Sequence, residues 1–173
     1  MKYILGIDPG VTGAYVLLSK VTKKIKICKI FTDFETVLED LKPYLGNMVA
    51  CVEKVHSMPG QGVKSTATFM ANAGGWEGFL TALEVPRSYV PPNTWSKKVF
   101  DTQAPRKPLN GADEKENKRI TAENRKIKKL HTVSFVLREL PGAKKHFRLK
   151  KDYDKADAIC IALYKRVQLG IKD

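Results

Sequence analysis

The stretch KYILGIDPGVTGAYVLLSKVTKKIKICKIF, residues 2–31, decides the fold. Residues 2–8 are rich in β-forming side chains and stop at Pro-Gly, which marks a turn. Residues 13–20 and 23–31 follow, and the second of these alternates Lys with Ile or Cys, the two-residue period of a half-buried strand. The stretch therefore predicts three strands in an antiparallel meander, with the first strand expected in the centre of a sheet.

The next part of the chain predicts a helix and a buried strand. Residues 32–46 keep an apolar spacing of three to four, and Thr32 or Asp33 can cap that helix. Residues 48–55 are an almost continuous apolar run, typical of a strand buried on both faces and parallel to the first. Residues 56–64 contain two glycines and a proline, so we expect a loop there.

Shorter elements follow. Residues 65–85 predict a helix that opens with a Ser or Thr cap, although it contains three glycines. Residues 87–92 predict a short strand. Residues 93–100 predict a short helix capped by Asn93 or Thr94.

The composition changes over residues 101–129, which have almost no large apolar side chains and a dense mixture of charges. We expect a loop and then a solvated helix that leads into 130–140. A basic linker at 141–153 precedes the last helix at 154–169. The order of elements predicts an α/β chain with an RNase H-like fold, a mixed five-stranded sheet flanked by helices. We expect one domain over 1–173, with 101–129 as a charged insertion or arm.

The net charge narrows the class of partner. The 31 Lys and Arg residues against 18 Asp and Glu give +13, and a globular chain this basic most often meets nucleic acid. No apolar stretch approaches the length of about 18 residues that a membrane span requires. The N-terminus lacks a signal-peptide pattern, so a cytoplasmic location is expected, without a membrane. The three widely spaced cysteines are expected to be buried free thiols.

Four acids occupy the places where such a fold would gather them. Asp8 ends the first strand and Glu53 ends the fourth, which should lie beside it. Asp154 and Asp157 are three apart, so they share one face of the last helix. Carboxylates that cluster repel one another unless cations neutralise them, and Mg²⁺ or Mn²⁺ prefers oxygen ligands. Such ions can promote hydrolysis of a phosphodiester.

Each of these acids also has a structural interpretation. Asp8 before Pro-Gly is a common turn residue, and Asp154 can be an N-cap. Asp157 can be an acid of the first helical turn, which the helix dipole favours. Glu53 is harder to explain in this way, because it places a charge in a buried strand. Together with the net charge, the four acids favour an active site.

Three blocks resemble the signature blocks of the RuvC family of Holliday junction resolvases. They are GIDPGVTGA at 6–14, CVEKV at 51–55 and DKADAICIA at 154–162, in the order and spacing of that family. The resemblance runs from about residue 3 to about residue 165. It implies that Asp8, Glu53, Asp154 and Asp157 bind metal and carry the catalysis. It further implies Mg²⁺, with Mn²⁺ as a substitute, a homodimer, and symmetric nicking of four-way DNA junctions without a small-molecule cofactor.

The sequence departs from the bacterial pattern after Glu53. Bacterial members carry an aromatic residue shortly after that glutamate, whereas His56 and Met58 stand here. His56 can stack on a base or be an ordinary polar loop residue. The charged stretch 101–129 is longer than in the bacterial type. The chain resembles the compact, very basic members found in phages, which implies a bacterial cell or a phage-infected host, and some viral relatives cut branched DNA more broadly.

Basic residues are the candidates for contact with DNA phosphates, together with His56. The run at 144–155 is the strongest of them, because it leads directly into Asp154, and either Lys150 or Lys151 could stabilise charge at the phosphate. The full set is Lys64, Lys97, Lys98, Arg106, Lys107, Lys118, Arg119, Lys144, Lys145, Arg148, Lys150 and Lys151.

One helix is a candidate dimer surface. The predicted helix 65–85 carries a wide apolar face, which can bind a second copy or simply cover the sheet. Its apolar residues are Phe69, Ala73, Trp76, Phe79, Leu80 and Leu83. Trp76 and Trp95 are expected in the core or at a dimer contact.

Three alternative functions use the same residues. The four acids would also serve an RNase H, a pre-ribosomal RNA nuclease or a general flap and branch nuclease. The block at 6–14 resembles the first phosphate loop of actin-like kinases and chaperones, but this chain has no second phosphate loop and too little length. A non-catalytic junction-binding protein is the third alternative.

Overall fold

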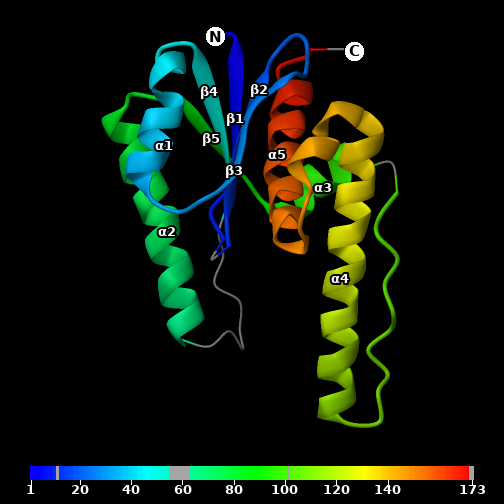
Figure 1. The fold of residues 1–173 in the computed structure, drawn as a ribbon. Coiled ribbons are helices and arrows are strands. Elements are labelled where there is room, and N and C mark those ends of the chain that lie inside the picture. Colours follow the sequence, from blue (N-terminus) through cyan, green and yellow to red (C-terminus); the bar gives the residue numbers. More distant parts are fainter. Residues whose placement is uncertain (11, 55–62, 101, 172–173) are drawn as a thin grey trace.

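A mixed five-stranded sheet forms the centre of the protein (Figure 1). The structure, a computed structural model, describes residues 1–10, 12–54, 63–100 and 102–171, with 63–65 described by their backbone alone. The strand order is β3-β2-β1-β4-β5, with β1 antiparallel to β2 and parallel to β4. The strands are β1 (Tyr3–Asp8), β2 (Ala14–Ser19), β3 (Ile25–Ile30), β4 (Met48–Glu53) and β5 (Arg87–Val90). The predicted meander and its central first strand are confirmed.

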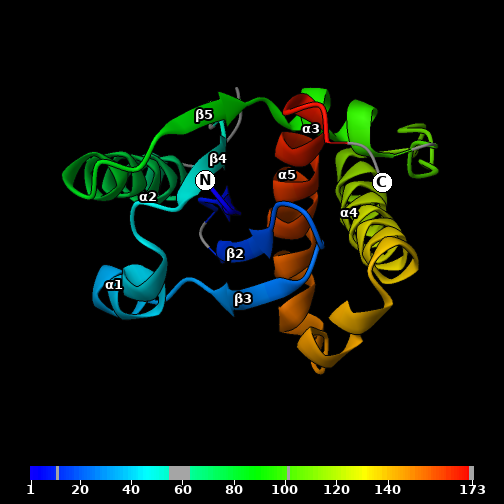
Figure 2. The ribbon, with the colours of Figure 1, turned by 90° about the horizontal axis from the view of Figure 1, so that it is seen from above.

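Helices cover both faces of the sheet, as the view from above shows (Figure 2). Helices α1 and α2 lie on one face, and α5 lies on the other with α3 and α4 beside it. The helices are α1 (Phe34–Leu41), α2 (Val63–Ala82), α3 (Pro92–Val99), α4 (Glu114–Glu139) and α5 (Asp154–Gln168). Short 3₁₀ turns are η1 (Lys42–Tyr44), η2 (Pro141–His146) and η3 (Lys150–Tyr153). This architecture confirms the predicted fold class.

The apolar alternation of the strands divides the core in two. Val16 and Leu18 of β2 point toward α5, whereas Tyr15 and Leu17 of the same strand point toward α1 and α2. All four are essentially buried, as expected for a strand in the interior of a sheet that is covered on both faces.

Gly6 allows α5 to approach the central strand closely. A Cβ atom built at Gly6 would lie 2.2 Å from the carbonyl oxygen of Ala158 and 2.8 Å from the nitrogen of Ala162. Any larger residue at this position would therefore push α5 away from β1. The glycine matters for function because α5 carries two of the four candidate acids.

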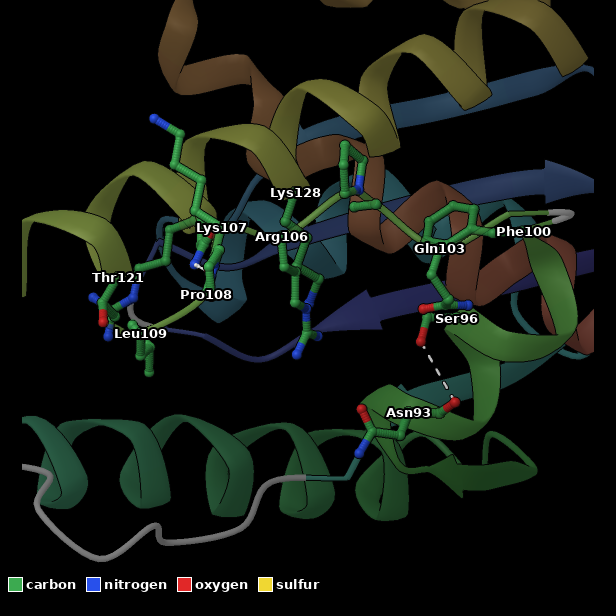
Figure 3. Close-up of a pocket in the computed structure, with 14 residues that line it drawn as sticks. Asn93, Ser96, Phe100, Gln103, Arg106, Lys107, Pro108, Leu109, Thr121 and Lys128 are labelled. Carbon is green, nitrogen blue, oxygen red and sulfur yellow. Dashed lines mark hydrogen bonds between the residues drawn. The ribbon is translucent and has the colours of Figure 1, made fainter. Parts of the chain in front are cut away.

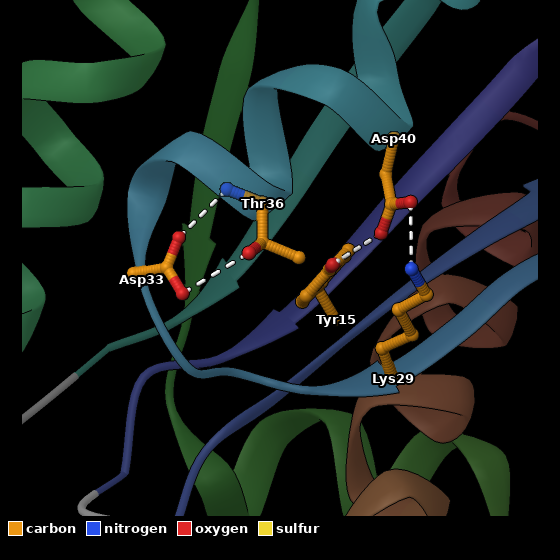
Figure 4. A network of polar contacts seen from close by, with 5 residues as sticks. All are labelled: Tyr15, Lys29, Asp33, Thr36 and Asp40. Atoms are coloured by element: carbon orange, nitrogen blue, oxygen red, sulfur yellow. Dashed lines mark hydrogen bonds and ion pairs between the residues drawn. The ribbon is translucent and has the colours of Figure 1, made fainter.

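Helix α1 is held to the sheet by polar contacts as well as by its apolar face (Figure 4). Asp33 caps the helix by accepting a hydrogen bond from the Thr36 nitrogen at 2.7 Å. Asp40 accepts hydrogen bonds from the Tyr15 hydroxyl at 2.5 Å and from Lys29 Nζ at 2.7 Å. Of the two predicted caps, Asp33 is the one used.

The arm extends beyond the sheet and consists of α4 and the strap, residues 102–113, which runs beside it (Figure 1). Asn124 holds the strap by accepting from the Lys107 nitrogen at 2.8 Å and donating to the Lys107 oxygen at 3.0 Å. Asn117 bonds the backbone of Gly111 in the same way, at 3.1 and 3.5 Å. The predicted loop and solvated helix both occur, and they form one ordered unit.

Three predicted details of the helices are wrong. Helix α2 begins at Val63, two residues before the expected start at residue 65. Helix α3 begins at Pro92 after Pro91, without a side-chain cap, because proline already has the backbone angle that a first helical turn needs. The expected linker at 141–153 contains the turns η2 and η3. In the part of the chain that the structure describes, no helix is both long and apolar enough to cross a bilayer.

Candidate active site

Two of the four acids lie at the same edge of the sheet. Asp8 is the last residue of β1 and Glu53 is the last residue of β4. These strands are parallel neighbours, and their register pairs Ile7 with Val52, one residue before the acids. Because the carboxyl ends of parallel strands meet at one edge, Asp8 and Glu53 lie side by side.

Helix α5 brings the other two acids to this edge. Asp154 is its first residue and Asp157 follows within the first turn, while the rest of the helix packs on the sheet through Ala158, Ile159 and Ala162. The close approach at Gly6 sets the depth of this contact. Asp154 does not act as an N-cap, because the helix begins after Tyr153 without a side-chain cap bond.

The electrostatics show that the four acids affect one another. Burial raises the pKa of Asp8 well above the usual value of 3.8, and the charges of Glu53, Asp157 and Asp154 raise it further. Burial is also the largest cause of the raised pKa values of Glu53 and Asp157, and each of these acids has another carboxylate as a further cause. We call Asp8, Glu53, Asp154 and Asp157 the acid cluster.

Each acid of the cluster has its own hydrogen-bond donor. Asp8 Oδ1 accepts from the Gly10 nitrogen at 2.9 Å, and Glu53 Oε1 accepts from Trp95 Nε1 at 2.8 Å. Asp154 Oδ1 is paired with Lys129 Nζ. A hydrogen bond from Thr132 lowers the pKa of Asp157 and so opposes the effect of burial. These donors restrain the orientations of the carboxylates.

The acid cluster suits a hard divalent cation by its chemistry. Four carboxylates offer the oxygen ligands that Mg²⁺ prefers, and their mutual repulsion is relieved by positive charge. The second oxygens of Asp8, Glu53 and Asp154 accept no hydrogen bond from the described residues. Within the same residues, no three His, Cys, Asp or Glu side chains form a group that could hold a metal ion. Binding an ion therefore requires these side chains to turn toward one another.

Trp95 has a contact that the sequence did not predict. The residue is fully buried in the core, which settles the choice between core and dimer contact, and its indole nitrogen binds Glu53. A tryptophan that is buried usually finds a partner for its N–H group. The pairing joins α3 to the end of β4, two elements whose contact could not be read from their separation in sequence.

Two lysines of α4 lie next to the acid cluster and were also missed. Lys129 pairs with Asp154, and Lys128 Nζ lies 6.0 Å from the centre of the Trp95 ring. The charge of Lys128 lowers the pKa values of both Asp157 and Glu53. The helical period indicates that Lys128 lies on the side of α4 that faces the core, because the buried Thr132 lies one turn after it.

The basic run at 144–155 is arranged differently from the expectation. Lys150 and Lys151 are exposed on η3, and the contact with Asp154 comes from Lys129. Lys155 Nζ binds Asp152 Oδ1 at 2.7 Å.

The expected linker at 141–153 contains a buried acid, Asp152. It is 7% exposed, and its Oδ2 accepts from the backbone nitrogens of Arg148 and Leu149 at 3.0 and 2.8 Å. The hydrogen bond from Lys155 is the largest cause of its lowered pKa. Asp152 therefore fixes the turn that leads into α5.

The other predicted DNA contacts fall into three groups. Lys107, Lys118 and Arg119 form ion pairs with glutamates of α4. His56 and the side chain of Lys64 lie outside the described residues. The remaining residues are exposed, on α3, on the strap, or on and between η2 and η3, and they are Lys97, Lys98, Arg106, Lys144, Lys145 and Arg148.

The apolar face of α2 covers the sheet of its own chain. Trp76 and Leu80 are fully buried, and Trp76 contacts the rings of Tyr15, Phe31 and Phe34. Phe79 and Leu83 are partly buried against the same core, and Phe69 and Ala73 are also half-buried. Of the two alternatives for this face, Trp76 and Leu80 follow the second, because they cover the sheet of their own chain.

Comparison with solved structures places this arrangement in a known fold. The chain is similar to T. thermophilus RuvC in complex with a Holliday junction substrate, with 16% identity, a TM-score of 0.58, and coverage of 95% of this chain and 92% of that chain. It is also similar to another Thermus thermophilus RuvC structure, with 17% identity, a TM-score of 0.55, and coverage of 97% and 96%. No family model matches the sequence, and no curated protein does so. The protein therefore shares the RuvC fold, which belongs to the RNase H-like class.

Proposed function

We propose that the protein is a Mg²⁺-dependent endonuclease that resolves four-way DNA junctions by symmetric hydrolysis of phosphodiester bonds, as a homodimer. The acid cluster is the observation that carries the proposal. Burial and neighbouring carboxylates raise the pKa values of Asp8, Glu53 and Asp157, so the cluster is costly unless cations neutralise it. The shared fold supports the proposal, since the similar RuvC structure was solved with a Holliday junction.

Asp8, Glu53, Asp154 and Asp157 would hold the ion, and Mn²⁺ should substitute for Mg²⁺. Divalent ions bound there would activate a water and stabilise the leaving 3′ oxygen. Hydrolysis forms a bond from the water oxygen to phosphorus and breaks the bond from phosphorus to the 3′ oxygen, which takes up a proton. The products carry a 5′-phosphate and a 3′-hydroxyl.

Neighbouring residues would position the acids and the phosphate. Trp95 holds Glu53 Oε1 in one orientation and leaves its second oxygen available. The pairing of Lys129 with Asp154 places an ammonium group at the edge of the acid cluster, where it can contact a phosphate oxygen. Lys128 adds a second positive charge near Glu53 and Asp157. Together these groups would stabilise negative charge that develops on the phosphate.

The excess of positive charge would hold the DNA backbone. The exposed lysines that would do so lie on α3, beside the C-terminal half of α5, and on η2 and η3, which precede the first residue of α5. They include Lys97, Lys98, Lys144, Lys145, Lys150 and Lys151. Because phosphate contacts release counterions, binding should weaken steeply with salt. A junction has two strands to cut, which favours a two-fold enzyme with two equivalent sites.

A substrate panel tests the proposal. Wild-type protein and Asp8→Asn are incubated with Mg²⁺ and a synthetic four-way junction, a duplex, a flap and an RNA–DNA hybrid. The expected result is paired nicks in the junction by the wild type, no cleavage by Asp8→Asn, and junction binding by both. Equal cutting of all substrates would instead support a broad branch nuclease or an RNase H-like nuclease. Binding without cleavage by the wild type would support a non-catalytic junction-binding protein.

A further inference from the structure

A pocket of about 580 Å³ lies between α3, the strap and α4 (Figure 3). Helix α3 contributes Asn93 and Ser96 to its lining, and the strap contributes Arg106 and a run of apolar residues. Helix α4 contributes Arg125 and Lys128. The volume is in the range of sites that accept a small molecule or one unit of a polymer.

The strap that forms one wall of the pocket is held in place. The amide side chain of Asn124 bonds both backbone groups of Lys107, the residue that follows Arg106. Lys107 Nζ is also paired with Glu123 Oε2 at 2.5 Å. The backbone is therefore held in place at the residue next to Arg106, by hydrogen bonds to both its nitrogen and its oxygen. This part of the pocket wall is an ordered segment.

The charge of the pocket has one sign. Among the described residues no acid lines it, and its four cations are Arg106, Lys107, Arg125 and Lys128. Lys107 is paired with Glu123, which is not part of the lining, whereas the other three form no ion pair with any described residue. Three converging cations without a carboxylate form a site for an anion.

The other groups in the lining show which anion fits. The Asn124 side chain is occupied by the strap, and the Ser96 hydroxyl donates to the Asn93 oxygen at 3.4 Å. Asn93 and Gln103, the other amides of the lining, form no side-chain hydrogen bond with the described residues and can contact a sugar or a base. Pro105, Pro108 and Leu109 form an exposed apolar wall, against which a sugar or a base can lie.

One residue links the pocket to the acid cluster. Lys128 lines the pocket and also lies over the ring of Trp95, which binds Glu53. The cations of the pocket are therefore near enough to contact a DNA strand bound at the acid cluster.

We propose that this pocket, which we call the strap pocket, binds one nucleotide unit of the DNA strand next to the cleaved phosphate, with its phosphate on Arg106, Arg125 and Lys128. The proposal rests on the proposed function, because it takes DNA as the substrate. It assigns the arm a role in holding a strand independently of base sequence, since phosphate contacts carry no sequence information.

A charge-matched pair of variants tests the strap pocket. Both are made in the Asp8→Asn background, and junction binding is measured by fluorescence anisotropy over a series of salt concentrations. The pocket variant is Arg106→Gln/Arg125→Gln/Lys128→Gln. The control variant, Lys118→Gln/Arg119→Gln/Arg138→Gln, removes three cations of α4 that do not line the pocket and are already paired with glutamates.

The pocket variant should bind about tenfold more weakly at moderate salt, because a hydrogen-bonded contact with a charged group is lost. The slope of log K against log salt should become shallower by about 0.7–0.9, the value for one phosphate. The control should lose about twofold or less, since its cations are shared with acids. Equal losses in the two variants would overturn the proposal, because they would mean that only the overall charge of the arm matters.

A second measurement has its main readout in Asp8→Asn, whose pocket is unchanged. Junctions that carry one uncharged methylphosphonate at successive positions are bound to Asp8→Asn and to its pocket variant. One position beside the cleaved phosphate should weaken binding to Asp8→Asn and have no effect on the pocket variant. Losses of equal size at every position, or the same profile for both proteins, would overturn the proposal.

The two proposals fail in different ways. A wild-type protein that binds DNA through the strap pocket and cuts none of the panel would remove the proposed function and leave the pocket. A wild-type protein that cuts the junction, with binding that is insensitive to the pocket variant, would remove the pocket and leave the function.

Discussion

Two groups of carboxylates on this protein serve opposite purposes. On the α1 side of the sheet, both oxygens of Asp40 accept hydrogen bonds, from Tyr15 and from Lys29 (Figure 4). At the carboxyl ends of β1 and β4, the acid cluster brings four like charges together. Each of Asp8, Glu53 and Asp154 keeps one oxygen that accepts no hydrogen bond from the residues the structure describes. The two cases differ in whether both oxygens of the acid accept hydrogen bonds from the described residues of the same chain.

The contrast separates structural acids from candidate functional ones. Asp40 anchors α1 to β2 and β3, so its contacts stabilise the fold. The acid cluster is half-buried and self-repelling, which lowers stability unless something outside the chain compensates. Acids that cost stability and keep oxygens available as ligands are candidates for function, in contrast to Asp40.

The largest expected difference between the two groups of acids is in the rate of junction cleavage. Asp8→Asn should reduce Mg²⁺-dependent junction cleavage on the order of 10⁴-fold, as when one member of a catalytic group that acts as a unit is removed. Asp40→Asn should leave the cleavage rate within about twofold, because Asp40 only holds α1. Single-turnover cleavage rates of the two variants provide the measurement. Similar losses in both would show that the two groups of acids are not distinct.

The next effect concerns the donor that holds Glu53. Trp95→Phe keeps a buried ring and removes the hydrogen bond to Glu53 Oε1. Cleavage at limiting Mg²⁺ should fall by about 10–100-fold, as for residues that orient a metal ligand, with partial recovery at high Mg²⁺.

Trp76→Phe is the matched control for that variant. Trp76 is also fully buried, but it lies on the other face of the sheet, and its indole nitrogen has no partner in the described part of the chain. It should lose stability to a similar extent and keep the wild-type dependence on Mg²⁺. An unchanged Mg²⁺ requirement in Trp95→Phe would contradict a positioning role for Trp95.

A smaller effect tests the structural acid directly. Asp40→Ala should lower the free energy of unfolding by about 1–3 kcal/mol, because the buried Tyr15 hydroxyl loses its acceptor. Adding Tyr15→Phe should recover part of that loss, since no unpaired hydroxyl then remains. Urea denaturation of both variants gives the comparison. If the double variant lost more unfolding free energy than the two single variants lose together, this explanation would be wrong.

The smallest effect is the pH dependence of stability in the absence of divalent ions. Burial and the neighbouring acids raise the folded pKa of Asp8 above its unfolded value near 3.8, so the folded protein binds this proton more tightly. The contribution of Asp8 to stability is therefore favourable at low pH and is lost as the pH rises from about 3.8 through the raised value. Asp8→Asn removes this pH-dependent contribution to stability, because asparagine does not titrate.

Denaturation of the wild type and of Asp8→Asn from mildly acidic to neutral pH gives the measurement. The stability advantage of Asp8→Asn should grow as the pH rises, and added Mg²⁺ should reduce it. An advantage that is constant with pH would mean that the charge of Asp8 is not costly in the folded protein.

Much of the fold was predictable because it depends on short-range periodicity. The alternation in residues 23–31 and the apolar runs at 2–8 and 48–55 predicted the strands and the central position of the first one. The errors fall at the ends of α2 and α3, where a cap or a proline decides the boundary, and in η2 and η3, which have no apolar period to detect.

The sequence by itself determined the positions of Asp8, Glu53, Asp154 and Asp157, because each stands at the end of a strand or the start of a helix, and such ends can be read from local patterns. Only the tertiary structure decided which side chains accompany them. Trp95, Lys128 and Lys129 reach the acid cluster, Asp152 becomes a buried anchor, and the face of α2 covers its own sheet. These contacts join residues that are far apart in the chain or depend on the path of a turn. They follow from how the helices pack on the sheet, which local periodicity does not encode.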